Sequence, residues 1–204
     1  MKESALTLSN YFIEIAQKDG KSLRPLRLMK LVYLSYAYCL VYLDKNVLNP
    51  RFDKVEAWKL GPVIPSVYHS FKDYGNKPIT HFTEVFTGTT EMDDGEELAS
   101  LYTPRVHDED VKSVCLLVWG EFSSFTDGQI VDFLHKDGSP WQCVYKEGEN
   151  ARISDNLTKE YFSKLLSGRT MGLRDDFTYE DTVRFCKETA QARVTSLKSA
   201  WLND

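Results

Sequence analysis

The chain has 204 residues, of which 42% are hydrophobic and 27% charged, a composition typical of a soluble globular protein with one sizeable core. Its formal net charge is -5, whereas domains that work mainly by neutralising nucleic-acid phosphates carry a basic excess. Nucleic acid is therefore a disfavoured partner.

The first helix is expected from about Leu6 to Lys18, where apolar residues recur at helical spacing and Gly20 follows the end. The second helix is expected from Pro25 to about Leu43. A proline at the first helical position loses nothing by lacking an amide hydrogen.

Residues 26–43 are apolar nearly all round, and this segment approaches the length needed to cross a bilayer. It contains Arg27 and Lys30, however, and a charge within lipid is costly. A helix that is apolar on every face also suits the middle of a helical domain. We therefore expect a buried central helix, and no membrane association, with a membrane span as the alternative.

The next residues, 54–60, alternate in polarity and favour a short strand, after which Gly61-Pro62 is expected to turn the chain. A third helix is expected over residues 65–74, with an apolar stripe on one face. Residues 76–107 are rich in Thr, Val, Phe and Tyr around an acidic turn. This composition predicts a β-hairpin or a long, partly ordered excursion.

Helical patterns return over residues 108–125, whose acidic start suits a helix N-terminus. Thr126 opens a capping box and a further helix, and Pro140 is placed to begin a short one. After a polar loop at residues 146–154, a helix is expected around residues 157–166. The predicted fold class is mainly α, with residues 1–168 as one helical domain and a small hairpin or extended excursion around 76–107.

Residues 169–204 are expected to form a linker and a C-terminal helical extension over about 179–202. The apolar positions of this helix follow the spacing of a coiled-coil seam: Val183, Cys186, Ala190, Val194, Leu197 and Trp201. The helix either folds back on its own domain or forms an arm for a partner or a homodimer. Val194, Leu197 and Trp201 are therefore candidates for partner binding.

Residue patterns that would indicate catalysis or a cofactor are not recognised in the sequence. It contains no nucleophile elbow, phosphate-binding loop, zinc-binding helix or dinucleotide turn. No Cys/His cluster has metal-ligand spacing. We therefore expect a protein that is not an enzyme and has no cofactor or metal. The four cysteines are expected to be reduced thiols: Cys39, Cys115, Cys143 and Cys186.

The N-terminal residues carry several charges and do not resemble an export signal, so we expect a cytoplasmic protein.

Two histidines, His69 and His135, lie beside sequence features that bear on function. His69 is off the apolar stripe of the third helix and is expected to be exposed. His135 precedes "KDGSPW", where Ser139 and Pro140 could fix its imidazole, and a structural hydrogen bond is favoured over catalysis. The alternative is a hydrolase-like enzyme that uses His135 with Cys143 or a nearby acid.

A basic strip stands at the start of the second helix, where Arg24, Arg27 and Lys30 recur every third residue after Lys21. Positive charge at this end opposes the helix macrodipole. The strip is therefore expected to pair within the chain or to bind an acidic partner. Internal pairing is the simpler interpretation, and Arg24 and Arg27 are kept as partner-binding candidates.

Four stretches, "LMKLVYLSYAYCL", "PRFDKVEAWKLGPVIPSVYHSFKDYG", "LHKDGSPW" and "ISDNLTKEYF", resemble in order and spacing the SocA-like or Panacea antitoxin-associated domain family. The resemblance covers roughly residues 5 to 165, and its most specific part is a W-x-x-G-P-V-x-P-x-x-Y pattern. The residues that match the family, with mainly structural roles, are Lys30, Tyr33, Trp58, Gly61, Pro62, Val63, Pro65, Tyr68, His135, Pro140 and Trp141.

The resemblance implies a non-catalytic helical domain of bacteria, phages or mobile elements that binds and neutralises a cognate protein toxin. It acts directly or as an adaptor that delivers the toxin to a cytoplasmic ATP-dependent protease. Lys59 and His69, on the exposed side of the signature, are further partner-binding candidates. The chain has Leu134 where the family often has threonine, and its final helix lies outside the match. A phage or mobile-element interaction protein without a toxin is the alternative.

Overall fold

The computed structural model describes residues 3–91 and 97–170 and confirms a mainly α fold with two small sheets. The helices are α1 (Ala5–Lys18), α2 (Pro25–Tyr42), α3 (Pro65–Phe71), α4 (Glu109–Phe122), α5 (Asp127–Leu134), α6 (Pro140–Val144) and α7 (Asp155–Thr170), with a 3-10 turn, η1 (Lys72–Tyr74). The strands are β1 (Val55–Trp58), β2 (Gly61–Val63), β3 (Val85–Glu91), β4 (Glu97–Tyr102) and β5 (Ala151–Ile153). The predicted final helix lies outside the described residues.

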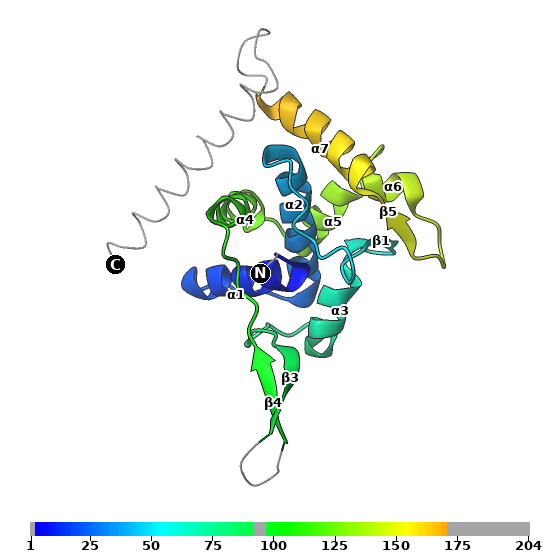
Figure 1. Cartoon of the computed structure of the whole chain (residues 1–204). Coiled ribbons are helices and arrows are strands. Elements are labelled where there is room, and N and C mark those ends of the chain that lie inside the picture. Colours follow the sequence, from blue (N-terminus) through cyan, green and yellow to red (C-terminus); the bar gives the residue numbers. More distant parts are fainter. Residues whose placement is uncertain (1–2, 92–96, 171–204) are drawn as a thin grey trace, which may run out of the picture.

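Helix α2 lies in the middle of the molecule, as its sequence predicts. It is buried almost continuously from Leu28 to Val41, and it contacts α1, α3, α4, α5, α7 and β2. Figure 1 shows these elements on different sides of α2. None of the helices in the described ranges combines the length and the apolar character that crossing a membrane requires. The apolar faces of α2 are thus covered by the protein itself.

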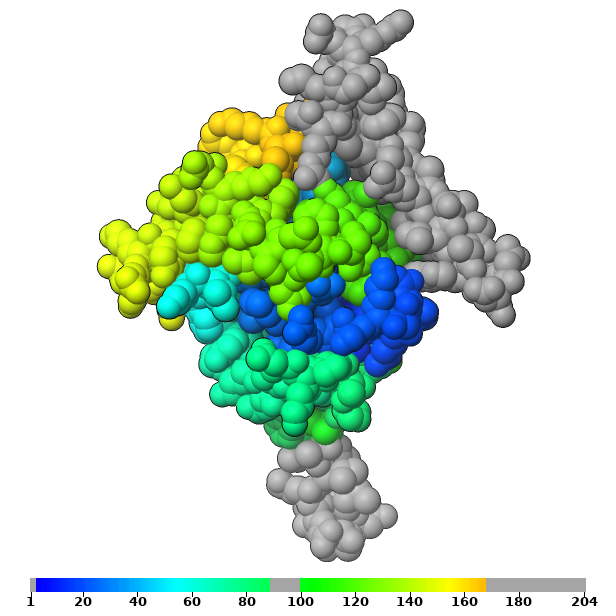
Figure 2. Space-filling view, turned by 180° about the vertical axis from the view of Figure 1, so that it is seen from behind, coloured from blue at the N-terminus to red at the C-terminus, as the bar shows by residue number. Residues whose placement is uncertain are grey.

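From the opposite side, part of α1 is visible at the surface (Figure 2). Figure 2 shows this helix, in blue, between the green residues of α4 and α5 and the cyan-to-teal residues around α3 and η1. Asp53 connects α1 to α3, because its buried carboxylate accepts hydrogen bonds from Ala5 N of α1 at 2.9 Å and from Ser66 Oγ of α3 at 2.7 Å. The N-terminus of α1 is therefore joined to α3 through one side chain.

The three-stranded antiparallel sheet has the order β2-β1-β5 and corrects two expectations. Gly61 and Pro62 do not turn the chain but lie in β2, and the turn falls at Lys59 and Leu60. The polar loop at 146–154 contains β5, which pairs with β1. β2 and β5 have three residues each, which is too short to show the alternation of apolar and polar residues that indicates a strand. Pro62 is tolerated in β2 because this strand lies at the edge of the sheet.

The predicted hairpin is present as β3 and β4, which we call the arm (residues 85–91 and 97–102). It extends away from the helical body, at the lower end of the molecule in Figure 1. A register shift between Phe86 and Gly88 marks a β-bulge.

The capping box at Thr126 is also confirmed, because Thr126 Oγ1 accepts from Gln129 N and the Gln129 side chain accepts from Thr126 N.

The burial of α2 makes a direct prediction for stability. Leu31 is fully buried on this helix, so Leu31→Ala should lower the free energy of unfolding by about 2–5 kcal/mol through lost contacts and a residual cavity. Leu60→Ala, at an exposed position, should change it by less than about 0.5 kcal/mol. Urea unfolding followed by circular dichroism measures both values. Equal losses would contradict the central position of α2.

Candidate functional site

The residues of the family signature converge where α2, the small sheet, α5 and α6 meet. Lys30 of α2 is only 1% exposed, and its Nζ donates a hydrogen bond to the carbonyl oxygen of Pro62 at 3.0 Å. This bond joins the central helix to β2. We call the group the signature junction and define it by six residues: Lys30, Trp58, Gly61, Pro62, His135 and Trp141.

Gly61 lies at the centre of the junction and has a backbone that favours glycine, with φ of +102°. A Cβ atom at this position would lie 3.2 Å from both Lys30 Nζ and His135 Nε2. Such a contact is tighter than most side chains make, and a non-glycine residue rarely adopts this φ. The glycine therefore allows β2 to approach both polar side chains.

Aromatic stacking holds the outer half of the junction. The imidazole of His135 stacks on the indole of Trp141 with ring centroids 3.6 Å apart and planes within 2°. Trp141 stacks in turn on Tyr145 at 4.5 Å, and its Nε1 donates to the carbonyl of Trp58 at 2.7 Å. Trp58 meets Tyr68 edge to face at 4.8 Å. Four signature residues are thereby packed into one connected set.

The expected hydrogen bond of His135 is not formed by its inner ring nitrogen. His135 Nε2 is a buried atom with no hydrogen-bond partner among the described residues, and stacking on Trp141 orients the ring instead. The hydroxyl of Ser139 caps α6 by accepting from Gln142 N. The turn expected to fix the imidazole therefore serves the start of α6, and Trp141 supplies the contact.

Burial alters the charge state of both polar groups in the junction. Desolvation lowers the pKa of Lys30 from 10.5 to about 7, and the hydrogen bond of its ammonium group goes to a neutral carbonyl, that of Pro62. Desolvation also lowers the pKa of His135, and the nearby charge of Lys30 lowers it further. The junction thus disfavours a positive charge on His135 beside that of Lys30.

The remaining signature residues belong to the core or begin helices. Tyr33 is buried, and its ring meets Phe162 of α7 edge-on at 6.0 Å. Val63 is buried in β2, while Pro65 and Pro140 are the first residues of α3 and α6. These positions agree with the mainly structural roles expected for them, although each role stays a prediction until it is tested by substitution.

The basic strip is divided between the surface and the interior. Arg24 and Arg27 both form ion pairs with Asp127 of α5, at 2.8 and 3.0 Å, and Arg27 also donates to the backbone carbonyl of Ser123 at 3.1 Å. Lys30 is buried in the junction. Asp127 lies a hundred residues from Arg27, so no local sequence pattern indicates this internal pairing.

The other partner-binding candidates lie apart from this ion pair. Lys59, at the β1–β2 turn, and His69, on α3, are both exposed, and the His69 ring meets Tyr68 edge-on at 5.3 Å. They stay candidates for partner binding. Three further candidates fall outside the described residues: Val194, Leu197 and Trp201.

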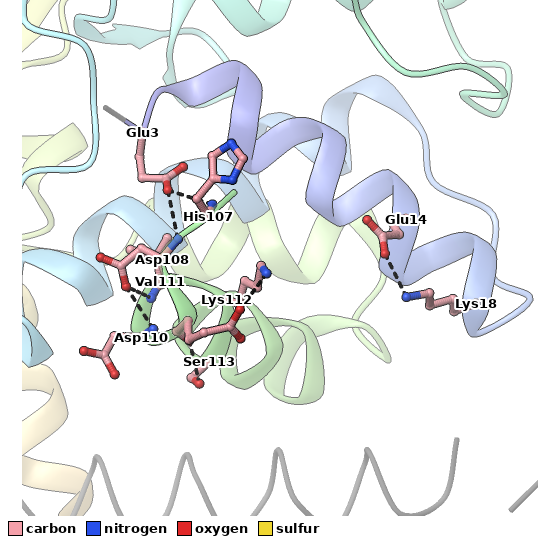
Figure 3. Close-up of polar contacts among 10 residues, drawn as sticks. Glu3, Glu14, Lys18, His107, Asp108, Asp110, Val111, Lys112 and Ser113 are labelled. Carbon is pink, nitrogen blue, oxygen red and sulfur yellow. Dashed lines mark hydrogen bonds and ion pairs between the residues drawn. The ribbon is translucent and has the colours of Figure 1, made fainter. Parts of the chain in front are cut away.

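A separate pocket of about 590 Å³ lies beside the N-terminus of α4 and is lined by Glu3, Lys45, Leu48, His107 and Asp108, among others. Its charged groups already have partners within the chain. Figure 3 shows Glu3 accepting from the backbone amides of His107 and Asp108, at 3.0 and 3.2 Å. Lys45 forms an ion pair with Asp108. Within the part of the chain that the structure describes, Glu3, Lys45 and Asp108 thus all have partners, and these charges do not point to a ligand.

The thiols and acidic side chains give no sign of a metal site in the described ranges. No group of three or more His, Cys, Asp or Glu residues within 3–91 and 97–170 could hold a metal ion. Cys39 and Cys115 are free and buried, whereas Cys143 is free and exposed. Cys186 lies outside the described residues.

The fold and the junction define a mainly helical domain in which a small antiparallel sheet is joined to a central helix. A model of the family described as "Antitoxin SocA-like, Panacea domain" matches residues 28–142, which is more than half of the chain. The chain belongs to this family. It is also 29% identical over 168 residues to Antitoxin SocA of Caulobacter vibrioides (strain NA1000 / CB15N), covering 78% of this chain and 81% of the relative. No solved structure matches.

The lowered pKa of Lys30 predicts a pH-dependent stability. Because the folded pKa of about 7 lies below 10.5, the unfolded chain binds more protons between these values, and the free energy of unfolding falls as pH drops from 10.5 to 7. The loss amounts to up to about 5 kcal/mol. Lys30→Met should remove this dependence, so that the variant gains stability relative to the wild type at about pH 7 and loses the gain at about pH 10.

Urea unfolding at several pH values between about 6 and 10 measures this effect. Lys59→Met, which removes an exposed lysine near the same sheet, is the matched control and should follow the wild-type profile. Parallel profiles for Lys30→Met and the wild type would show that burial does not perturb Lys30.

The close approach at Gly61 predicts a second effect. Gly61→Ala should lower the free energy of unfolding by about 2–4 kcal/mol, because the new methyl group meets Lys30 and His135 at a backbone angle that alanine avoids. Gly20→Ala is the control, since Gly20 also has a positive φ but nothing lies within 4 Å of its added Cβ. It should cost only about 1 kcal/mol. Thermal and urea unfolding compare the two, and equal costs would exclude crowding at Gly61.

Proposed function

We propose that this protein is an antitoxin that binds and neutralises a protein toxin. The observation that carries the proposal is the family match over residues 28–142, which contains all six residues of the signature junction. The similarity to Antitoxin SocA extends over most of the chain and supports the same role. Direct neutralisation and delivery to a cytoplasmic ATP-dependent protease are two ways in which such a protein can act on its toxin.

The geometry of the junction supports a binding protein over the hydrolase-like alternative. His135 Nε2 is buried within the junction, where Gly61 and Lys30 also lie. The exposed Cys143 thiol instead contacts the carbonyl of Gly138 at 3.7 Å. A general base must reach the proton that it removes, so an inward-facing and stacked imidazole is poorly placed for catalysis.

Charge also supports a protein partner. The chain has a net charge of -5, and charge complementarity speeds association with an oppositely charged partner. The same charge disfavours phosphate backbones and anionic lipid surfaces. A toxin with a basic binding surface therefore fits this protein best.

The test is co-expression with the protein encoded by the neighbouring open reading frame. We expect that protein to stop bacterial growth when it is expressed alone and growth to resume when the present protein is added. A frameshifted copy of the present gene is the control and should give no rescue. A neighbour that is harmless alone, or one that stays lethal in the presence of this protein, would contradict the proposal and favour an interaction protein without a toxin.

The amount of toxin in rescued cells separates the two modes of action. A direct neutraliser leaves the toxin at its normal level in a stable complex. An adaptor lowers the level of the toxin, and inactivation of the ATP-dependent protease restores both the toxin and its lethality. Immunoblotting of the toxin in the two strains distinguishes these outcomes.

A further inference from the structure

The arm exposes large apolar side chains that the rest of the described protein does not cover. Phe86 is 59% exposed and Leu101 57% exposed, and they lie directly opposite each other in the β3–β4 register. Val85, next to Phe86, is also exposed. Cross-strand apolar pairs stabilise a sheet when they are covered, whereas this pair faces solvent. The arm therefore carries an apolar surface that lacks a partner within the described residues.

Both edges of the arm are open as well. In the described part of the chain, β3 and β4 pair only with each other, so each strand has one row of backbone groups without a strand beside it. A two-stranded hairpin is marginally stable in water, and open edges readily accept another strand. The arm thus combines an apolar face with two edges that can be extended by an added strand.

The base of the arm is fixed to the body by one buried side chain. Asn10 of α1 is 2% exposed, and its Nδ2 donates to the carbonyls of Thr83 and Pro104, each at 2.9 Å. Its Oδ1 accepts from Thr83 N at 2.9 Å. Thr83 and Pro104 flank the arm on its two sides, so one amide group holds both ends together. The arm is consequently presented from a fixed base and not from a loose connection.

Charge identifies the kind of partner. In the described residues 84–91 and 97–102 the sequence has three carboxylates, Glu84, Glu91 and Glu97, and no lysine, arginine or histidine. A second copy of this chain would bring the same negative charge to the arm and be repelled, as would nucleic acid or an anionic membrane. A basic, extended protein segment with apolar side chains would satisfy the charge, the apolar pair and the open edges together.

We propose that the arm is the surface on which the toxin docks, and that a basic segment of the toxin adds as a strand to an open edge of β3 or β4. In this arrangement, main-chain hydrogen bonds extend the sheet, and apolar side chains of the added strand cover Phe86 and Leu101. The inference rests on the proposed antitoxin function and specifies the surface that carries it out.

The test uses the full-length protein and the purified product of the neighbouring open reading frame, with affinity measured by calorimetry. The double variant Phe86→Ser, Leu101→Ser removes the apolar pair, and Glu84→Lys, Glu97→Lys reverses charge on both strands. Each is expected to weaken binding at least about tenfold, as truncation of an interface anchor does. Phe52→Ser is the matched control, because Phe52 is 65% exposed but lies outside the arm, and it should leave affinity within about twofold.

Hydrogen exchange provides an independent readout of strand addition. Backbone amides of β3 or β4 should exchange more slowly when the toxin is bound, since an added strand takes up the open edge. Unchanged exchange in the arm would overturn strand addition. Circular dichroism and the melting temperature confirm that each variant is folded, which is expected because the substituted apolar side chains are exposed.

The outcomes separate this inference from the proposed function. If the wild-type protein does not bind the neighbouring gene product, the antitoxin proposal fails. If the wild type binds and the arm variants bind equally well, the antitoxin proposal stands and the arm is not the docking surface. A loss of self-association in the arm variants, without a loss of toxin binding, would instead assign the arm to a second copy of the chain and overturn the inference.

Discussion

The hydrogen bond from Lys30 to the Pro62 carbonyl is the constraint on which the arrangement of the small sheet depends. It connects the central helix to β2 and brings Gly61 beside His135. His135 then stacks on Trp141, whose indole donates to the backbone of Trp58 and returns the chain of contacts to β1. A buried lysine whose hydrogen bond goes to a neutral carbonyl is costly, so we infer that it specifies the register of these elements more than it stabilises them.

Features with a local cause could be predicted from the sequence. The all-round apolar character of α2 predicts a central position, and the Thr126 capping box marks the start of α5, because both depend on neighbouring residues. β2 and β5 could not be predicted in this way. Each has three residues, and the β1–β5 pairing joins segments nearly a hundred residues apart. Asp127 could not be predicted as the partner of Arg27 for the same reason, because the two residues are 100 positions apart in the sequence.

The candidate site was predicted as a set of residues but not as a geometry. The family signature contains Lys30, Gly61 and His135, yet neither the lowered pKa of the imidazole nor its stacking on Trp141 follows from the order of these residues along the chain. The junction is also largely internal, while the apolar pair of the arm lies outside it. The six residues of the signature junction and the exposed apolar pair of the arm therefore occupy different parts of the molecule.

The bonds from Asn10 to Thr83 and Pro104 have a consequence for how such a protein could change. They hold Thr83 and Pro104 close together at α1, and the entropic cost of closing a longer loop between two such fixed ends rises only slowly. The sequence between Thr83 and Pro104 can therefore change while both ends of the segment stay bound to Asn10. Its side chains can be exchanged without repacking the helices beneath it, so a chain of this design can acquire a new binding preference while its core stays unchanged.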